Sequence, residues 1–137
     1  MLKYYGADAD FSLEGKTAVI TGGAAGIGYA TAQFFAKKGV KICLADLNPD
    51  VDSIAKELDP KAIGVAGDAT DESYRERVLE EAVKAFGQVD ILINCAGIVA
   101  LEKAELISEA DWDRTMNVNL KASFMMAQMM GRYFIDK

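Results

Sequence analysis

Four glycines fall within eight residues, in the stretch TGGAAGIG at 21–28, directly after the apolar run TAVI at 17–20. Glycine at such a turn lets backbone N–H groups at the start of a helix come close to a ligand, and the helix dipole there favours negative charge. The stretch therefore predicts a site for phosphate groups, and a tight strand-to-helix turn is the purely structural alternative. A P-loop is excluded, because no Gly-Lys-Ser/Thr follows the glycines.

The second candidate for a ligand-binding group is a carboxylate. Asp46 ends another apolar run, 18 residues after Gly28. At the end of a second strand it can accept hydrogen bonds from the ribose 2′-OH of NAD, and it would repel the 2′-phosphate of NADP. Neither the glycine turn nor Leu47-Asn48-Pro49 offers a cation to that phosphate. The pair of features predicts a dinucleotide site with a preference for NAD. The alternative, a helix-capping Asp46, is disfavoured because Asn48 is expected to cap that helix.

These residues need elements that bring strand ends together. Four short apolar runs with few charges have the character of strands buried on both faces of a parallel sheet. They span 16–21, 40–46, 61–67 and 89–97. Helical spacing separates them, so the order is β-α-β-α-β-α-β-α. Right-handed crossovers then predict an α/β, doubly wound parallel sheet, the Rossmann fold, here with only its first four strands and helices. Ligands bind at the carboxyl ends of such strands.

The first two helices are predicted from one apolar face and from two Asx-Pro pairs. The face of the first helix lies ahead of Gly39 and consists of Ile27, Ala30 and Phe34. Asn48-Pro49 is predicted to be the N-cap and first residue of the second helix, and Asp59-Pro60 to end it.

The later helices are predicted in the same way. An apolar stripe before Gly87 consists of Val78, Leu79, Ala82, Val83 and Phe86. The residues 108–111 (SEAD) form a capping-box-like start for a long helix. That helix is expected to run through Trp112, Met116, Leu120 and Phe124 toward Met130.

The spacing TG-x-x-x-G-x-G resembles the cofactor signature of the short-chain dehydrogenase/reductase family. It is carried by Thr21, Gly22, Gly26, Ile27 and Gly28. Further segments match the family in order along 11–137: the lead-in LEGK at 13–16, GDAT at 67–70, NCAG at 94–97 and VNL at 118–120. The second asparagine of the family's Asn-Asn-Ala-Gly is replaced by Cys95, which changes one side-chain hydrogen bond.

The resemblance implies a role for each matching position. Asp68 occupies the family's adenine-contacting position, and Asn119 matches its catalytic asparagine. The implied cofactor-binding residues are Gly22, Ala24, Gly26, Ile27, Gly28, Asp46, Leu47, Asp68, Ala69, Asn94, Ala96, Gly97 and Val118. From the residues alone, Asp68 could equally cap the next helix, and Asn119 could be a polar group satisfied within the chain.

Hydride transfer between an alcohol and nicotinamide also needs a group that moves the hydroxyl proton. A tyrosine, with a reference pKa of about 10, does this only when a nearby cation lowers its pKa. The resemblance implies a Tyr-x-x-x-Lys pair on a later helix and a serine before it. Tyr133 and Lys137 have this spacing, but they follow Asn119 on what is expected to be the same helix. They are therefore not expected to be the catalytic pair.

The resemblance thus implies the NAD-binding part of an oxidoreductase acting on a secondary alcohol or ketone, with a polyol or sugar alcohol as the suggested substrate. The 137 residues are expected to bind NAD weakly and to catalyse nothing alone. Two other interpretations stay open: a non-catalytic NAD-binding module from a truncated paralogue, and another doubly wound nucleotide binder such as a methyltransferase.

Composition limits the remaining possibilities. The length fits one domain, predicted at 13–137 after a polar leader at 1–12 and lacking the catalytic C-terminal half. A net charge of −6 argues against nucleic acid as a partner. No apolar run approaches the roughly 18 residues of a membrane span, and no signal peptide is recognised, so a cytoplasmic location is expected. With no histidine and only Cys43 and Cys95, no metal site is expected, and both thiols are expected to be reduced.

The final predicted helix suggests a partner surface. The stretch ASFMMAQMMG at 122–131 has no charge, and its apolar residues point all round the helix. One face can cover the sheet, and the rest needs another surface. The family resemblance places this helix in a subunit interface, which implies a homo-oligomer, a dimer or tetramer. The fourth strand is also expected to have an unpaired edge.

Overall fold

A computed structural model describes residues 11–137, so nearly all of the leader predicted at 1–12 lies outside the described residues. Four parallel strands form one sheet in the order β3-β2-β1-β4. Their bounds are Thr17–Thr21 for β1, Lys41–Asp46 for β2, Ile63–Ala66 for β3 and Ile91–Asn94 for β4. Each lies inside a predicted run, and the predicted α/β fold class is confirmed. Within the described chain β4 pairs only with β1.

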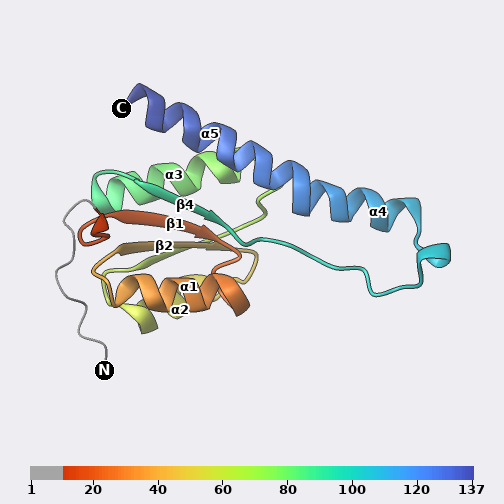
Figure 1. Ribbon diagram of the computed structural model, residues 1–137, viewed down its shortest axis with the longest axis horizontal. Helices are drawn as coiled ribbons and strands as arrows, with labels where there is room; N and C mark the ends of the chain where they lie inside the picture. The colour runs from red at the N-terminus through yellow and green to blue at the C-terminus, as the bar shows by residue number, and fades with distance from the viewer. Residues whose placement is uncertain (1–10) are drawn as a thin grey trace.

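Helices cover both faces of the sheet (Figure 1). One face carries α1 (Gly26–Ala36) and α2 (Val51–Leu58), and the other carries α3 (Glu72–Phe86) and α5 (Ser123–Asp136). Successive strand residues point to opposite faces, so each strand contributes to two cores. In β1, Ala18 and Ile20 pack on the α1–α2 side, and Val19 packs on the α3–α5 side. This explains why the strands are apolar without alternation.

The predicted ends of the later helices are confirmed. Gly87 terminates α3 in the left-handed conformation, with φ +87. Ser108 is the N-cap of α4 (Glu109–Met116), and its side chain accepts a hydrogen bond from the N–H of Asp111 at 3.1 Å. The predicted stripe of α3 faces the sheet, with Val78 and Ala82 fully buried. Asx-Pro at 59–60 lies directly after α2, as predicted.

The predicted apolar face of α1 is wrong. Ile27, Ala30 and Phe34 are exposed, and the helix instead buries Gly28 and Ala32. The reason is proximity: a Cβ on Gly28 would contact the carbonyl oxygen of Gly22 in the turn before the helix. Only the face with the smallest side chains can lie that close.

The predicted cap of α2 is also wrong. The helix begins at Val51 with Asp50 at the N-cap position, and Asp50 makes no side-chain capping bond. Asn48 instead accepts a hydrogen bond from the N–H of Asp50 at 2.9 Å. It therefore shapes the turn ahead of the helix, and Pro49 lies in that turn. An Asx residue can satisfy a turn or a cap with the same side chain, and the sequence does not separate the two.

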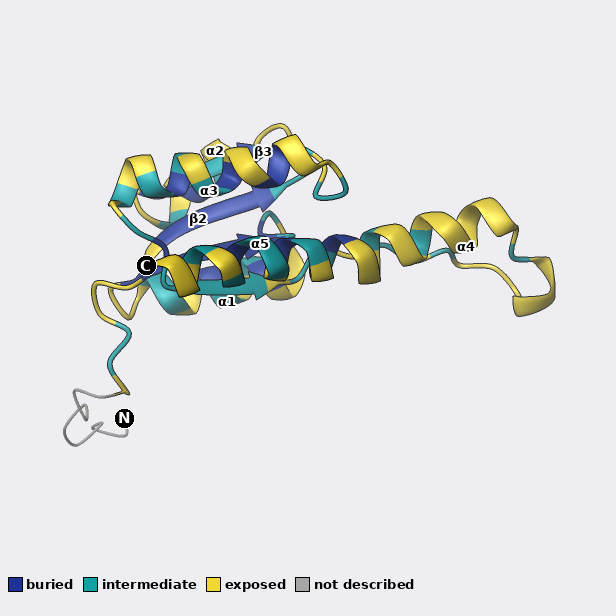
Figure 2. Cartoon of the chain, turned by 90° about the horizontal axis from the view of Figure 1, so that it is seen from above, coloured by how far each residue is buried: buried dark blue, intermediate teal, exposed yellow. Residues whose placement is uncertain are grey.

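The loop after β4 leads into an arm, residues 98–116, which includes the short helix η2 (Ala104–Leu106) and α4 and projects from the sheet (Figures 1 and 2). A π-helical segment, Asn117–Ala122, joins α4 to α5. Met126 and Met130 of α5 are fully buried against the sheet, and Phe124 is 61% exposed. None of the helices within residues 11–137 has both the length and the hydropathy to span a bilayer.

Candidate functional site

A cleft lies where the strands end, between the loops after the strands and the start of the arm. Its lining comes from all four strand ends, from α3, from α4 and from the π-helical segment. It consists of Thr21, Gly22, Ala45, Leu47, Gly67, Asp68, Ala69, Tyr74, Ala96, Gly97, Ile98, Arg114 and Val118. Several predicted cofactor-binding residues thus meet, although up to 96 positions separate them in the sequence (Gly22 to Val118). A larger cavity of about 570 Å³ at the amino-terminal end of the sheet contains none of them.

The glycines of the first turn have different roles. Gly22 has φ +62, and a Cβ there would lie 2.7 Å from the backbone of Cys95 and Ala96. Gly22 and Gly28 are therefore required by close packing within the chain. Gly26 has φ +55, and a Cβ added there would have nothing within 4 Å, so it leaves open surface at the start of α1. Ala25, at the N-cap, makes no side-chain capping bond. The first N–H groups of α1 are thus able to bind an anion.

Thr21 holds the loop after β4 against this turn. Its hydroxyl accepts hydrogen bonds from the N–H groups of Cys95 and Ala96, both at 3.2 Å, and donates to Oδ1 of Asn94 at 3.4 Å. Asn94 in turn donates to the carbonyl of Ser123 at 3.3 Å and does not line the cleft. The structure thus gives Asn94 a bracing position between β1, β4 and α5.

Asp46 lies at the end of β2, beside the glycine turn. Its Oδ2 accepts a hydrogen bond from the N–H of Ala24 at 3.0 Å, and its Oδ1 accepts one from the N–H of Asn48 at 2.9 Å. Each carboxylate oxygen has a second lone pair, so both can still accept a ligand hydroxyl. The capping alternative is wrong for Asp46, because Asp50 occupies the N-cap of α2.

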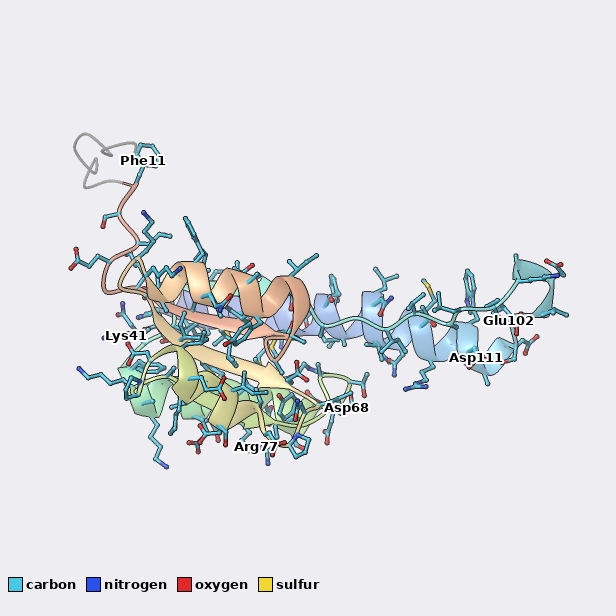
Figure 3. All side chains as sticks on the ribbon, turned by 90° about the horizontal axis from the view of Figure 1, so that it is seen from below. Phe11, Lys41, Asp68, Arg77, Glu102 and Asp111 are labelled. Atoms are coloured by element: carbon cyan, nitrogen blue, oxygen red, sulfur yellow. The ribbon has the colours of Figure 1, made fainter. Side chains whose placement is uncertain are left out.

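The loop after β3 contributes Asp68 and Ala69 to the lining of the cleft. Asp68 is labelled in Figure 3. Oδ1 of Asp68 accepts hydrogen bonds from the N–H and the hydroxyl of Thr70, at 2.9 and 2.8 Å. The capping alternative is wrong here too, since the N-cap of α3 is Asp71. Asp68 is exposed and keeps its second oxygen for a ligand.

Tyr74 packs against the loop after β3 and holds it in place. This role was not predicted from the sequence. Its hydroxyl donates to the carbonyl of Val65 at 2.6 Å, and a Cβ on Gly67 would contact its ring. Burial raises the pKa of Tyr74, with smaller contributions from Cys43 and Asp46. The tyrosine is therefore a neutral, fixed part of the cleft. A buried tyrosine on a helix has no distinctive sequence signal, and Thr21 was found only as part of the glycine motif.

Asn119 lies in the π-helical segment and binds the loop after β4. Its Oδ1 accepts a hydrogen bond from the N–H of Ile98, and its Nδ2 donates to the carbonyl of the same residue, both at 2.8 Å. Both halves of the amide are thus satisfied within the chain, as one of the two sequence interpretations proposed. The pair of bonds fixes Ile98 and the neighbouring Gly97 in the wall of the cleft.

Tyr133 and Lys137 lie at the other end of the sheet. The hydroxyl of Tyr133 accepts a hydrogen bond at 3.3 Å from the N–H of Val89, which precedes β4. Nζ of Lys137 lies 5.5 Å from the ring centroid of Tyr133 and donates to Gln88 at 2.8 Å. Neither side chain lines the cleft, so the pair holds the tail of α5 against the start of β4.

The two cysteines are free. Cys43 is buried in β2, and burial, with a smaller contribution from Glu81, raises the pKa of its thiol to about 12. Cys95 is half-buried beside the glycine turn. Within residues 11–137, no cluster of three or more potential metal-ligating side chains (His, Cys, Asp or Glu) is found.

Comparison with known proteins finds one family and several similar chains. The family described as short chain dehydrogenase matches residues 16–137. An NAD-dependent glycerol dehydrogenase of Listeria innocua is 42% identical over 98% of this chain and 53% of its own length. A D-threitol dehydrogenase of Mycolicibacterium smegmatis is 39% identical over 94% of this chain and 51% of its own.

A 2-dehydro-3-deoxy-D-gluconate 5-dehydrogenase of Dickeya dadantii is 38% identical, over 93% of this chain and 51% of its own length. The chain thus spans about half the length of the curated relatives it matches.

Proposed function

The chain belongs to the short-chain dehydrogenase family, and on that premise we propose that it is the NAD-binding part of an oxidoreductase that moves a hydride between nicotinamide and a secondary alcohol or ketone. A polyol or sugar alcohol is the proposed substrate, since similar chains are named for glycerol and D-threitol. NAD, when bound, supplies the hydride acceptor. The residues of this chain bind and orient it.

One observation carries the proposal: the segments expected to touch a dinucleotide converge at the carboxyl ends of the strands. Gly26 and the first N–H groups of α1 would hold the pyrophosphate. Asp46 would accept the ribose hydroxyl hydrogen bonds, because both of its oxygens retain a lone pair. Asp68 and Ala69 would meet the adenine. The open position at Gly26 and the uncapped helix start fit such a ligand.

The remaining proposed contacts complete the set of cofactor-binding residues. They are Gly22, Ala24, Ile27, Gly28, Leu47, Asn94, Ala96, Gly97 and Val118. Ala24 and Asn94 would act through the segments that they brace, by the hydrogen bonds to Asp46 and Ser123. Asn119 is proposed as the catalytic asparagine. In the structure its side-chain amide is hydrogen-bonded to the backbone of Ile98.

The binding proposal is tested by titrating the 137-residue chain with NADH, NADPH and S-adenosylmethionine in parallel, by fluorescence or calorimetry. We expect NADH to bind most tightly. Absence of NADH binding, or tighter binding of S-adenosylmethionine, would overturn the proposal in favour of another nucleotide binder.

Catalysis is a separate question. We expect the chain alone to bind the cofactor without turnover, because Tyr133 and Lys137 lie at the opposite end of the sheet from the cleft. Alcohol-dependent NADH formation by this chain would contradict that expectation. The second candidate, a non-catalytic NAD-binding module, predicts the same binding and no turnover in the full-length protein as well.

We also propose that the protein forms a homo-oligomer, a dimer or tetramer, through the methionine-rich helix α5. Its outward-facing Phe124 is 61% exposed, and Leu120 in the preceding π-helical segment is 60% exposed. Sedimentation of the full-length protein would test this, with a monomer at micromolar concentration as the contrary result. A cytoplasmic location stays a proposal based on the sequence.

A further inference from the structure

Arg114 is a cation in the lining of the cleft, and it comes from α4, which is far along the chain from the glycine turn. It lies on α4, lines the cleft together with Asp68 and Val118, and is exposed. Both ion pairs found within residues 11–137 involve other residues, and the Arg114 guanidinium has no hydrogen-bond partner there. Arg114 is the one lysine or arginine among the residues that line the cleft, and its guanidinium is therefore free to bind a ligand there.

The surroundings of Arg114 suit a flat, largely apolar group. Arg114 and Val118 are four residues apart and share a helix face. The same cleft is lined by Leu47, Ala69 and Ile98. Asp68 is the one carboxylate of the lining, and it forms no ion pair with Arg114. The arm beyond them carries Glu102 and Asp111 away from the sheet (Figure 3).

We propose that Arg114 stacks its guanidinium on the adenine ring of the dinucleotide and thereby sets part of the affinity for the adenosine end. This inference rests on the proposed function. A guanidinium is planar and weakly hydrated, so it stacks on aromatic faces. The pyrophosphate is expected at Gly26 and the start of α1, which do not line this cleft. The ligand group nearest to Arg114 is therefore the base that Asp68 and Ala69 are expected to meet.

The test compares three probes on four proteins. The probes are adenosine, ADP-ribose and NADH, and the proteins are the wild-type chain, R114A, R114K and the control R132A. Arg132 is an exposed residue of α5 that does not line the cleft, and its loss changes the net charge equally. We expect R114A to weaken adenosine and NADH binding about two- to fivefold, the fold-change of an exposed cation–π contact.

The other variants identify the kind of contact. R114K should bind adenosine as weakly as R114A, because an ammonium is a compact, strongly hydrated charge that stacks poorly. R132A should match the wild type with every probe. Nuclear magnetic resonance titration measures these weak affinities, and thermal melting shows whether each variant is folded.

Each contrary result has one meaning. If the wild-type chain binds none of the probes, the proposed function itself is overturned. If the wild type binds NADH and R114A binds it equally well, only the role of Arg114 is overturned. If adenosine binding is unchanged in R114A while ADP-ribose binding falls and R114K restores it, Arg114 contacts a phosphate, and stacking is overturned.

Discussion

Replacing Gly22 by alanine should destabilise the chain more than the same replacement at Gly26, although both glycines have a similar positive φ. Their φ angles are +62 and +55. An L-residue in this left-handed region costs about 1–2 kcal/mol. That cost is common to both variants, so their difference isolates the packing around the missing side chain.

The packing differs sharply between the two positions. A Cβ on Gly22 would lie 2.7 Å from three backbone atoms of Cys95 and Ala96, and nothing lies within 4 Å at Gly26. The loop after β4 would have to move, although the hydroxyl of Thr21 holds it by two hydrogen bonds of 3.2 Å. Overpacking of this kind costs about 1–3 kcal/mol. We therefore expect G22A to lower the free energy of unfolding by about 2–5 kcal/mol and G26A by about 1–2 kcal/mol.

Urea unfolding followed by circular dichroism measures both values. G131A is the control, because Gly131 lies inside α5 with no atom near its Cβ position. Alanine there should stabilise the chain by about 0.5–1 kcal/mol through helix propensity. A G22A variant as stable as G26A would refute the packing argument. G26A should also bind NADH more weakly while staying folded, since its methyl group would occupy the open surface at the start of α1.

Three further predictions concern single side chains. The thiol of Cys43 keeps its proton in the folded state up to a pKa of about 12, while the unfolded thiol titrates near its ordinary pKa of 9.0. The stability that the protonated Cys43 thiol allows is therefore fully present below pH 9 and is lost as pH rises toward 12. The free energy of unfolding should fall by up to about 1.4 kcal/mol per pH unit in this range. Urea unfolding at several pH values should show this fall in the wild type and a smaller fall in C43A. N119A removes both hydrogen bonds to Ile98 and should speed hydrogen exchange of the Ile98 amide and lower stability by about 1–2 kcal/mol; unchanged exchange would contradict the bracing role. D46N should weaken NADH binding about tenfold or more and reduce the ratio of NADH affinity to NADPH affinity. If D46N keeps the affinity ratio of the wild type, the charge of Asp46 does not determine the choice between the two cofactors.

The sheet was predictable because its strands are marked in two ways. Each predicted run is apolar on both faces, and a glycine, proline or charged residue lies at or beside nearly every end of the four runs. The pairing order then follows from right-handed crossovers, which leave few arrangements for four parallel strands. Helix ends were predictable where a residue can act only as a cap in its context, as Ser108 does at the start of α4 and Gly87 at the end of α3.

Only part of the cleft was predictable from the sequence. The residues that were found differ physically from those that were missed. A glycine where a core side chain is expected is conspicuous in a sequence, so residues such as Gly22 were found. Thr21 and Tyr74 contribute by holding backbone segments in place, through hydrogen bonds to Ala96 and Val65. Such residues are common in any core. Arg114 joins the cleft from α4, 46 positions after Asp68, and only the folding of the chain brings the two together.

Apolar side chains on α1 and α5 remain exposed on both faces of the molecule. Helical spacing identifies an apolar face, and burial depends on what lies against that face. Ile27 and Phe34 of α1 are 80% and 58% exposed, and Phe124 of α5, on the other face of the sheet, is 61% exposed. Full burial of such a side chain is worth about 1.5–3 kcal/mol, and covering the part that is still exposed would contribute the corresponding share of that range. Any surface that covers them therefore stabilises the fold by linkage, and for α5 a second subunit is the proposed cover. Alanine at Phe124 should thus weaken association of the full-length protein while changing the stability of the 137-residue chain by no more than about 0.5 kcal/mol.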